Sequence, residues 1–444
     1  MDIAQLIPQF GGLIWTLLAF VVALSVIVTI HEYGHYIVGR WSGIHAEVFS
    51  LGFGPVIFAR TDRRGTRWQL ALLPLGGYVR FKGDADAASA QPDASIADLS
   101  PAERRSTLTG APLWARAATV AAGPVFNFLF AILVFAGVTF TTGVAVEDAV
   151  VGEVRAMPGQ VDPLQTGDLI LSMDGRPVAT LSDAFTIASD LPPADTTRYE
   201  VERDGQKITL NGPFPFPPVA SSIAPTSAAQ EAGLRIGDVI TAVDGQPVRS
   251  FTELRDRIGA TDGQPVTLSV WNGTPREVSL TPKRQDIPTP DGGFETRWLI
   301  GITGGLIFDP ETRRAGPLEA LHLGARQSWT IVTTSLSGMW HMVTGAISTC
   351  NLQGPIGIAE TSGAAASDGA QSFVWFLAVL SVAVGLMNLF PIPVLDGGHL
   401  VFYAAEAVLR RPPNPRVVQA FMTVGLALIL GLMVFALSND ILCP

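Results

Sequence analysis

The chain has 444 residues, of which 48 % are hydrophobic and only 15 % are charged, a composition that is unusual for a water-soluble protein. Its formal net charge is −10, and its arginines lie in short loops beside apolar runs, which excludes a basic nucleic-acid-binding face. We therefore expect a membrane protein without a nucleic-acid partner.

Uncharged stretches long enough to cross a bilayer as helices, which takes roughly 20 residues, occur four times in the chain. They are Ile3–Ile30, Ala117–Val146, Gly369–Leu395 and Val417–Asn439. The first lacks a basic start and continues into a polar motif, so we expect it to remain in the protein as a span and not to be a cleaved signal. The prediction is a polytopic α-helical membrane protein with four transmembrane helices.

The first span, assigned to residues 1–40, ends in the motif His31-Glu32-Tyr33-Gly34-His35. At 3.6 residues per turn, His31 and His35 share one helix face and can offer two imidazole nitrogens to one Zn²⁺. Glu32 lies about 100° around the helix, where it can take a proton from water at the metal. The alternative is a set of interfacial polar residues whose side chains reach the cytoplasm.

Residues 41–83 are predicted to form a β-hairpin from Glu47–Arg60 and Arg67–Phe81. The apolar content is high for a loop, so we expect the hairpin to dip toward the membrane, where non-helical backbone must line a cavity or pack on protein. A small soluble sheet beside the membrane is the alternative. Residues 84–112 are predicted to be a flexible cytoplasmic linker before the second span, at 113–146.

An internal repeat with a spacing of 70 residues follows the second span. Gly167-Asp168-Leu169-Ile170 recurs as Gly237-Asp238-Val239-Ile240, and each copy continues into an Asp-Gly turn and a helix-like stretch. The repeat predicts two small α+β modules, at 147–215 and 216–284. Two unrelated β-rich spacers are the alternative.

Residues 285–368 are expected to form a connector with an interfacial helix over Gln327–Ser348. A fifth span there would place Arg410, Arg411 and Arg416 outside, against the positive-inside rule.

The third span region, 369–400, ends with a motif that runs from Asn388 to His399. Pro391 and Pro393 break the helix, so Asp396 is predicted to lie on unwound backbone. Asp396 can complete a His₂Asp zinc site, with His399 as a rival ligand, and a helix cap is the alternative role for the carboxylate. A cytoplasmic loop at 401–416 and a fourth span with an outer tail at 417–444 complete the chain.

Lys and Arg residues fix the expected orientation. They crowd the loops between the first and second spans and between the third and fourth, so both loops are predicted to be cytoplasmic, with both termini and the modules outside. This topology puts Asp396 at the depth of His31 and His35, and a His₂Asp set leaves a fourth position for water, as a catalytic zinc site requires.

Taken together, these motifs resemble the site-2 protease family of intramembrane zinc metalloproteases, of the bacterial regulator of sigma-E protease type. The resemblance covers nearly the whole chain and includes Gly123-Pro124 with Asn127 and Gly354-Pro355-Ile356. It implies PDZ-like modules that exclude bulky substrates, a membrane-reentrant β-loop, and an Asn388 that supports the substrate or the transition-state oxygen. The second module matches the PDZ pattern better than the first.

The resemblance also implies location and partners. We expect a monomer in the bacterial inner membrane, with its active site near the cytoplasmic side and periplasmic modules. Its substrates would be single-span membrane proteins such as anti-sigma factors after a first cut, and remnant signal peptides. Cys350 and Cys443 are both expected outside, either as a disulfide or as two thiols. A scaffold with a degenerate site and an ion transporter are the rival functions; the lack of matched membrane repeats argues against the transporter.

Overall fold

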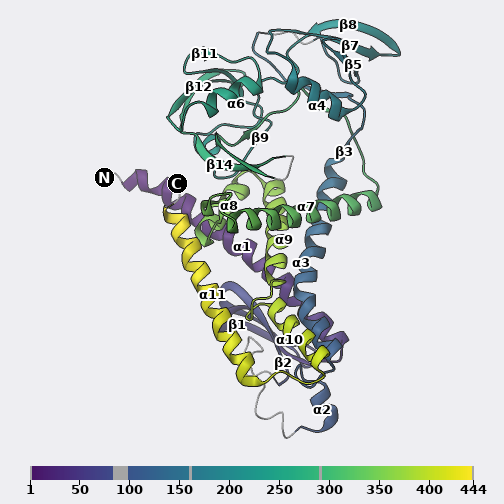
Figure 1. Cartoon of the computed structure of the whole chain (residues 1–444), viewed down its shortest axis with the longest axis vertical. Coiled ribbons are helices and arrows are strands. Elements are labelled where there is room, and N and C mark those ends of the chain that lie inside the picture. The colour runs from purple at the N-terminus through teal and green to yellow at the C-terminus, as the bar shows by residue number, and fades with distance from the viewer. Residues whose placement is uncertain (1–2, 84–98, 160–162, 290–292, 443–444) are drawn as a thin grey trace. The chain divides into compact units, whose positions relative to one another are not determined.

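The computed structural model describes residues 3–83, 99–159, 163–289 and 293–442 (Figure 1). The chain divides into two compact units. The first, called here the membrane unit, comprises Met1–Val138, Leu318–Met339 and Leu352–Cys443, and the second, the module unit, comprises Thr139–Pro317 and Trp340–Asn351.

Four helices of the described residues are long and apolar enough to cross a membrane, which confirms the predicted number of spans. They are Gly12–Trp41 within α1 (Ile3–Trp41), α3 (Leu113–Thr142), α9 (Ala370–Asn388) and α11 (Pro415–Leu442). The remaining helices of five or more residues outside the modules are α2 (Pro101–Arg105), α7 (Pro317–Val343), α8 (Pro355–Ser367) and α10 (Asp396–Leu409). The uncharged stretch that was expected to be interfacial therefore lies mostly within α7.

Small residues bring the helices of the membrane unit into close contact, as is common between membrane helices. A Cβ added to Gly34 of α1 would lie 2.5 Å from the carbonyl oxygen of Ala122 in α3. A Cβ added to Gly363 of α8 would lie 2.4 Å from Oγ1 of Thr16 in α1. Larger side chains at these glycines would therefore push the helices apart.

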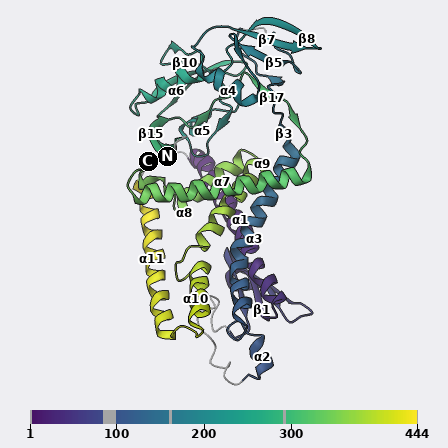
Figure 2. The ribbon, with the colours of Figure 1, turned by 45° about the vertical axis from the view of Figure 1, so that its right-hand side comes forward.

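α9 packs on α3 through a polar contact, in which the Ser381 hydroxyl donates to the backbone carbonyl of Asn127 at 3.0 Å. α10 lies between α11 and α3 in both views (Figure 2).

The predicted hairpin is present as β1 (Ala46–Thr61) and β2 (Arg67–Phe81), and it curls on itself. Phe49 in the first half of β1 pairs with Val79 on one side and with Trp68 on the other, so β1 lies between the two ends of β2. The segment around Val79 therefore forms one edge of the curled sheet.

The bend in β1 occurs near Gly52, whose φ of 87° is unfavourable for other residues. Beyond it, large apolar side chains are exposed on the hairpin: Phe53, Val56, Ile57, Phe58, Leu70, Leu72, Leu73 and Leu75. Exposed apolar surface of this extent is typical of a face that contacts a membrane or another protein.

The predicted linker at 84–112 differs in part from the structure. Residues 84–98 lie outside the described residues, but Pro101–Arg105 forms α2, which Ser100 begins with a capping box to Glu103.

The two repeat copies of the module unit form matching four-stranded sheets. Their strand orders are β6-β5-β7-β8 and β11-β10-β12-β13, and each sheet has its own buried core. The first contains β5 (Leu169–Met173), β6 (Arg176–Pro177), β7 (Thr197–Arg203) and β8 (Gln206–Gly212), with helix α4 (Leu181–Asp190). The second contains β10 (Val239–Val243), β11 (Gln246–Pro247), β12 (Val266–Trp271) and β13 (Pro275–Leu280), with helices α5 (Ala228–Glu231) and α6 (Phe251–Gly259).

A buried aspartate explains the Gly-Asp element of the repeat. Asp168 in the first module is fully buried and accepts two hydrogen bonds from Arg203, both at 2.7 Å. Asp238 in the second module is also fully buried and accepts one from Arg276 at 2.5 Å. Each aspartate thus fastens the turn before its first strand to a later strand of the same sheet.

A return segment closes both modules, which differs from the expected boundaries of 147–215 and 216–284. The strand β16 (Ile302–Thr303) pairs with β9 (Ser222–Ile223) of the second module. Shortly afterwards, β17 (Phe308–Pro310) pairs with β4 (Val151–Val154) of the first module. The second module is therefore nested inside the first.

The other strands of this unit are β3 (Val144–Ala145), which pairs with β18 (Thr312–Arg313), and the hairpin of β14 (Lys283–Pro288) and β15 (Phe294–Leu299). Cys443, on which the question of a disulfide depends, lies outside the described residues.

Candidate metal centre

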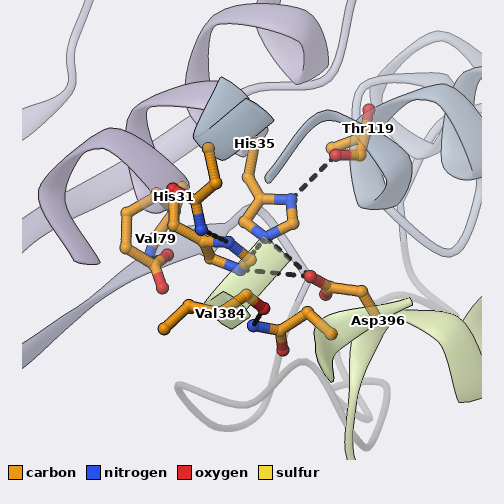
Figure 3. Close-up of polar contacts among 9 residues, drawn as sticks. His31, His35, Val79, Thr119, Val384 and Asp396 are labelled. Atoms are coloured by element: carbon orange, nitrogen blue, oxygen red, sulfur yellow. Dashed lines mark hydrogen bonds and ion pairs between the residues drawn. The ribbon is translucent and has the colours of Figure 1, made fainter. Parts of the chain in front are cut away.

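Three side chains from distant parts of the chain converge in the membrane unit. His31 Nε2 lies 3.1 Å from Asp396 Oδ2, and His35 Nε2 lies 3.5 Å from the same oxygen. The two imidazole Nε2 atoms are 3.1 Å apart. Figure 3 shows both rings directed toward Asp396. In the described part of the chain, these three residues form the group with metal-ligand geometry, and the rival His399 is not a member.

Asp396 is the first residue of α10, so its predicted placement on unwound backbone is wrong. The unwound stretch is Leu389–Leu395, and the helix resumes immediately after it. Close approach explains the Gly-Gly pair that follows: a Cβ at Gly397 would lie 2.3 Å from the carbonyl oxygen of Phe390. The break therefore redirects the chain, and the new helix carries the carboxylate.

The tautomer of His35 can be read from its neighbours. Its Nδ1 lies 2.8 Å from the backbone carbonyl oxygen of Thr119, which can only accept a hydrogen bond. Nδ1 therefore carries the proton, and the lone pair is on Nε2. Figure 3 shows the Nδ1 side of the ring directed at Thr119 and the Nε2 side directed at Asp396.

Asn127 supports the other imidazole. Its Nδ2 lies 3.3 Å from His31 Nδ1, while its Oδ1 is buried without a hydrogen-bond partner. The oxygen and nitrogen of an amide are assigned from their hydrogen-bond partners. Turned by 180°, the amide would place Oδ1 where it accepts a hydrogen bond from the Nδ1–H of His31, so that His31 adopts the same tautomer as His35.

These donors fit a zinc ion. With metal–ligand bonds of about 2.0 Å, the ligand atoms of a tetrahedral site lie about 3.3 Å apart, close to the three separations seen here. Asp396 Oδ2 is buried and has no hydrogen-bond partner despite its two short contacts, as expected for an oxygen directed at a cation. The side chains of His31, His35 and Asp396 are only 11 %, 12 % and 16 % exposed.

Gly123 of α3 leaves room for the two rings. A Cβ at this position would lie 2.3 Å from His35 Nε2 and 2.8 Å from His31 Cε1. Gly123 of the Gly-Pro pair therefore has a direct steric relation to His31 and His35, which the motif by itself does not indicate.

Glu32 is held by the hairpin. Its Oε2 accepts a hydrogen bond from the backbone N–H of Val79 at 3.0 Å, on the edge of the curled sheet. Asn388 lies at the end of α9, where its Nδ2 donates to the backbone carbonyl of Val384 at 3.0 Å.

Comparison with known proteins agrees with this geometry. The model of peptidase family M50 matches residues 19–432. Proteins named "Putative zinc metalloprotease" from Rhizobium meliloti and Agrobacterium fabrum are 38 % and 36 % identical to the chain, covering 96 % and 97 % of each sequence. The "Regulator of sigma-E protease RseP" of Salmonella typhimurium is 34 % identical over 97 % of this chain and 99 % of its own. The chain therefore belongs to peptidase family M50, the site-2 protease family of zinc metalloproteases.

Proposed function

We propose that this chain is an intramembrane endopeptidase whose Zn²⁺ is held by His31, His35 and Asp396, and which cuts the membrane-spanning segments of other proteins. The observation that carries the proposal is the convergence of two imidazole lone pairs and one buried carboxylate oxygen at separations of 3.1–3.5 Å. Ionisable groups at membrane depth are costly and mark functional sites, and these three groups lie in or beside membrane helices.

His31, His35 and Asp396 would hold the Zn²⁺, which when bound would supply Lewis-acid activation of a water molecule and of the scissile carbonyl. Glu32 then acts as the general base and afterwards returns the proton to the leaving amine. The Val79 N–H leaves one carboxylate oxygen of Glu32 for this proton transfer, because it hydrogen-bonds only Oε2. Asn388 supports the substrate or the transition-state oxygen: its Nδ2 donates one N–H to the Val384 carbonyl and has a second N–H for this contact.

The curled hairpin supports a role in substrate presentation. A transmembrane helix hides its peptide bonds in internal hydrogen bonds, so a segment must be extended before it can be cut. An extended segment can add to a sheet edge by main-chain hydrogen bonds. The edge at Val79 contacts the general base, so a strand that adds near it would lie beside the proposed catalytic centre.

We assign the two modules as PDZ-like domains on the periplasmic side, together with both termini, in the bacterial inner membrane. Their matching strand orders support the assignment as two copies of one module. There they would exclude substrates with bulky outer domains, so that cleavage follows an earlier cut. Anti-sigma factors with one span, and remnant signal peptides, are the proposed substrates, in line with the names of the regulator of sigma-E protease relatives.

The test is co-expression with candidate single-span anti-sigma factors, scored for cleavage by the wild type and by Glu32→Gln. The variant should bind zinc with wild-type stoichiometry and lose cleavage, since it keeps the three ligands and lacks the base. Asp396→Asn should lose both zinc and cleavage. Retained cleavage by purified Glu32→Gln would refute the assigned role of this residue.

A further inference from the structure

The helix that carries Asp396 fully buries few of its residues. Within α10, the buried residues are Gly397 and Gly398, both in its first turn. The helix is preceded by the non-helical stretch Leu389–Leu395, and it ends at Arg410, which has the left-handed conformation with φ of 54°. Neither flanking segment continues the helix, and the close contacts of Gly397 and Gly398 with the preceding stretch hold only its first turn, so the rotation of α10 about its axis also depends on contacts nearer its far end.

A two-point ion pair supplies such a contact near the far end of α10. Arg116 of α3 donates from Nη1 to Glu406 Oε2 at 3.0 Å and from Nη2 to Glu406 Oε1 at 2.6 Å. Its Nε donates to the backbone carbonyl of Ala111 at 3.2 Å, and its guanidinium lies 5.2 Å from the ring centroid of Tyr403. The two charged side chains are only 16 % and 17 % exposed. A guanidinium that donates from Nη1, Nη2 and Nε and stacks on an aromatic ring has little freedom to rotate.

α3 is also the helix against which the imidazoles rest. Thr119, one turn after Arg116, accepts the hydrogen bond from His35, and Gly123 faces both rings. The ion pair therefore fastens the helix of Asp396 to the helix that supports the other two proposed ligands.

The ion pair between α3 and α10 matters because metal ligands must lie within narrow limits of distance from the ion. A roll of α10 by about 20° would move an atom about 6 Å from the helix axis by about 2 Å. Zinc ligands are held to within about 0.2 Å of their preferred distances. We infer that the Arg116–Glu406 pair, stacked on Tyr403, is a positioning device that sets the rotation of α10 and keeps Asp396 in the ligand group. This inference rests on the proposed ligand role of Asp396.

The test uses the full-length purified protein in detergent and four variants: Arg116→Lys, Arg116→Met, Glu406→Gln and the exchange Arg116→Glu with Glu406→Arg. Zinc affinity is measured by competition with a chelator, stability by thermal unfolding, and kcat and KM with a single-span substrate. The matched control is Lys283→Met with Glu231→Gln, which removes an ion pair in the module unit whose side chains are 33 % and 59 % exposed.

Arg116→Met and Glu406→Gln should weaken zinc binding about tenfold, in the range found for outer partners of metal ligands. They should lower kcat at limiting zinc, leave KM unchanged and recover activity as zinc is raised. Arg116→Lys should be intermediate because it keeps the charge without the fork, and the exchange should restore part of the affinity. The control should bind zinc like the wild type.

Unchanged zinc affinity with a lowered unfolding temperature would overturn the inference, since the pair would then serve stability alone. Wild-type zinc affinity in Arg116→Lys would also overturn it, because the two-point geometry would be unnecessary. Zinc binding by Asp396→Asn separates the two proposals. If Asp396 is not a ligand, this variant retains zinc; if only the positioning role of the Arg116–Glu406 pair is wrong, this variant still loses zinc.

Discussion

Gly123→Ala tests how the imidazoles rest on α3. The added Cβ would lie 2.3 Å from His35 Nε2 and 2.5 Å from His35 Cε1. An ordinary contact between such atoms is about 3.5 Å, so the ring must move by about 1 Å. That shift is about five times the distance tolerance of a zinc ligand.

We expect Gly123→Ala to weaken zinc binding at least 100-fold, equivalent to about 2.7 kcal/mol, and to abolish peptidase activity. The chain should still fold, because alanine favours a helix over glycine by about 1 kcal/mol and the rings can move away. Zinc content is measured by mass spectrometry on purified protein, and folding by circular dichroism and thermal unfolding.

The matched control is Gly137→Ala in the same helix, where an added Cβ meets no atom within 4 Å. It should retain zinc and activity. If Gly123→Ala binds zinc and cleaves substrate like this control, the placement of the rings against α3 is refuted.

Three further predictions concern polar contacts. Asn127→Leu should weaken zinc binding 10- to 100-fold, measured by chelator competition, because His31 Nδ1 loses its buried partner; unchanged binding would exclude that role. Asp440→Asn should lower the free energy of unfolding by about 1 kcal/mol, because the Asp440 carboxylate accepts hydrogen bonds from three backbone N–H groups around the start of α8. An unchanged unfolding temperature would count against this capping role. Arg203→Met should cost about 3 kcal/mol of local stability by leaving Asp168 buried and unpaired, seen as faster hydrogen exchange in β5 and β7 but not in β10 and β12. Burial raises the pKa of Asp168, but hydrogen bonds from Arg203 and the Gln165 backbone outweigh this effect and lower the pKa overall. The ion pair of the wild type therefore stabilises the first module above about pH 4, and this stabilisation declines as the pH falls further. Equal protection of β5 and β7 from hydrogen exchange at pH 7 and pH 3 would contradict this.

Local patterns in the sequence predicted the features that depend on neighbouring residues. The four spans follow from uncharged length, and the Asp-Gly turns of both modules follow from their flanking apolar strands. The ligand group required one long-range step, since Asp396 was placed beside His31 and His35 by the distribution of arginines. The geometry bears out that proximity.

Features that depend on two distant residues could not be predicted in the same way. Arg116 is one of the basic residues between the first two predicted spans, and nothing near it in the sequence indicates a partner 290 residues later. The helix that starts at Asp396 was missed because two prolines and two glycines indicate a break but do not show where the helix resumes. Asn127 was part of the family resemblance, but its contact with His31 is visible only once α1 and α3 are packed together.

The nesting of the modules has a consequence for how the chain is made. The first module starts with β4 but lacks the partner of that strand until Phe308–Pro310 has been synthesised, after the whole second module. Contacts between residues so far apart in sequence form slowly, since a long loop must close first. On the ribosome, the second module can therefore be completed before the first, and β4 of the earlier copy remains without its partner strand during the interval.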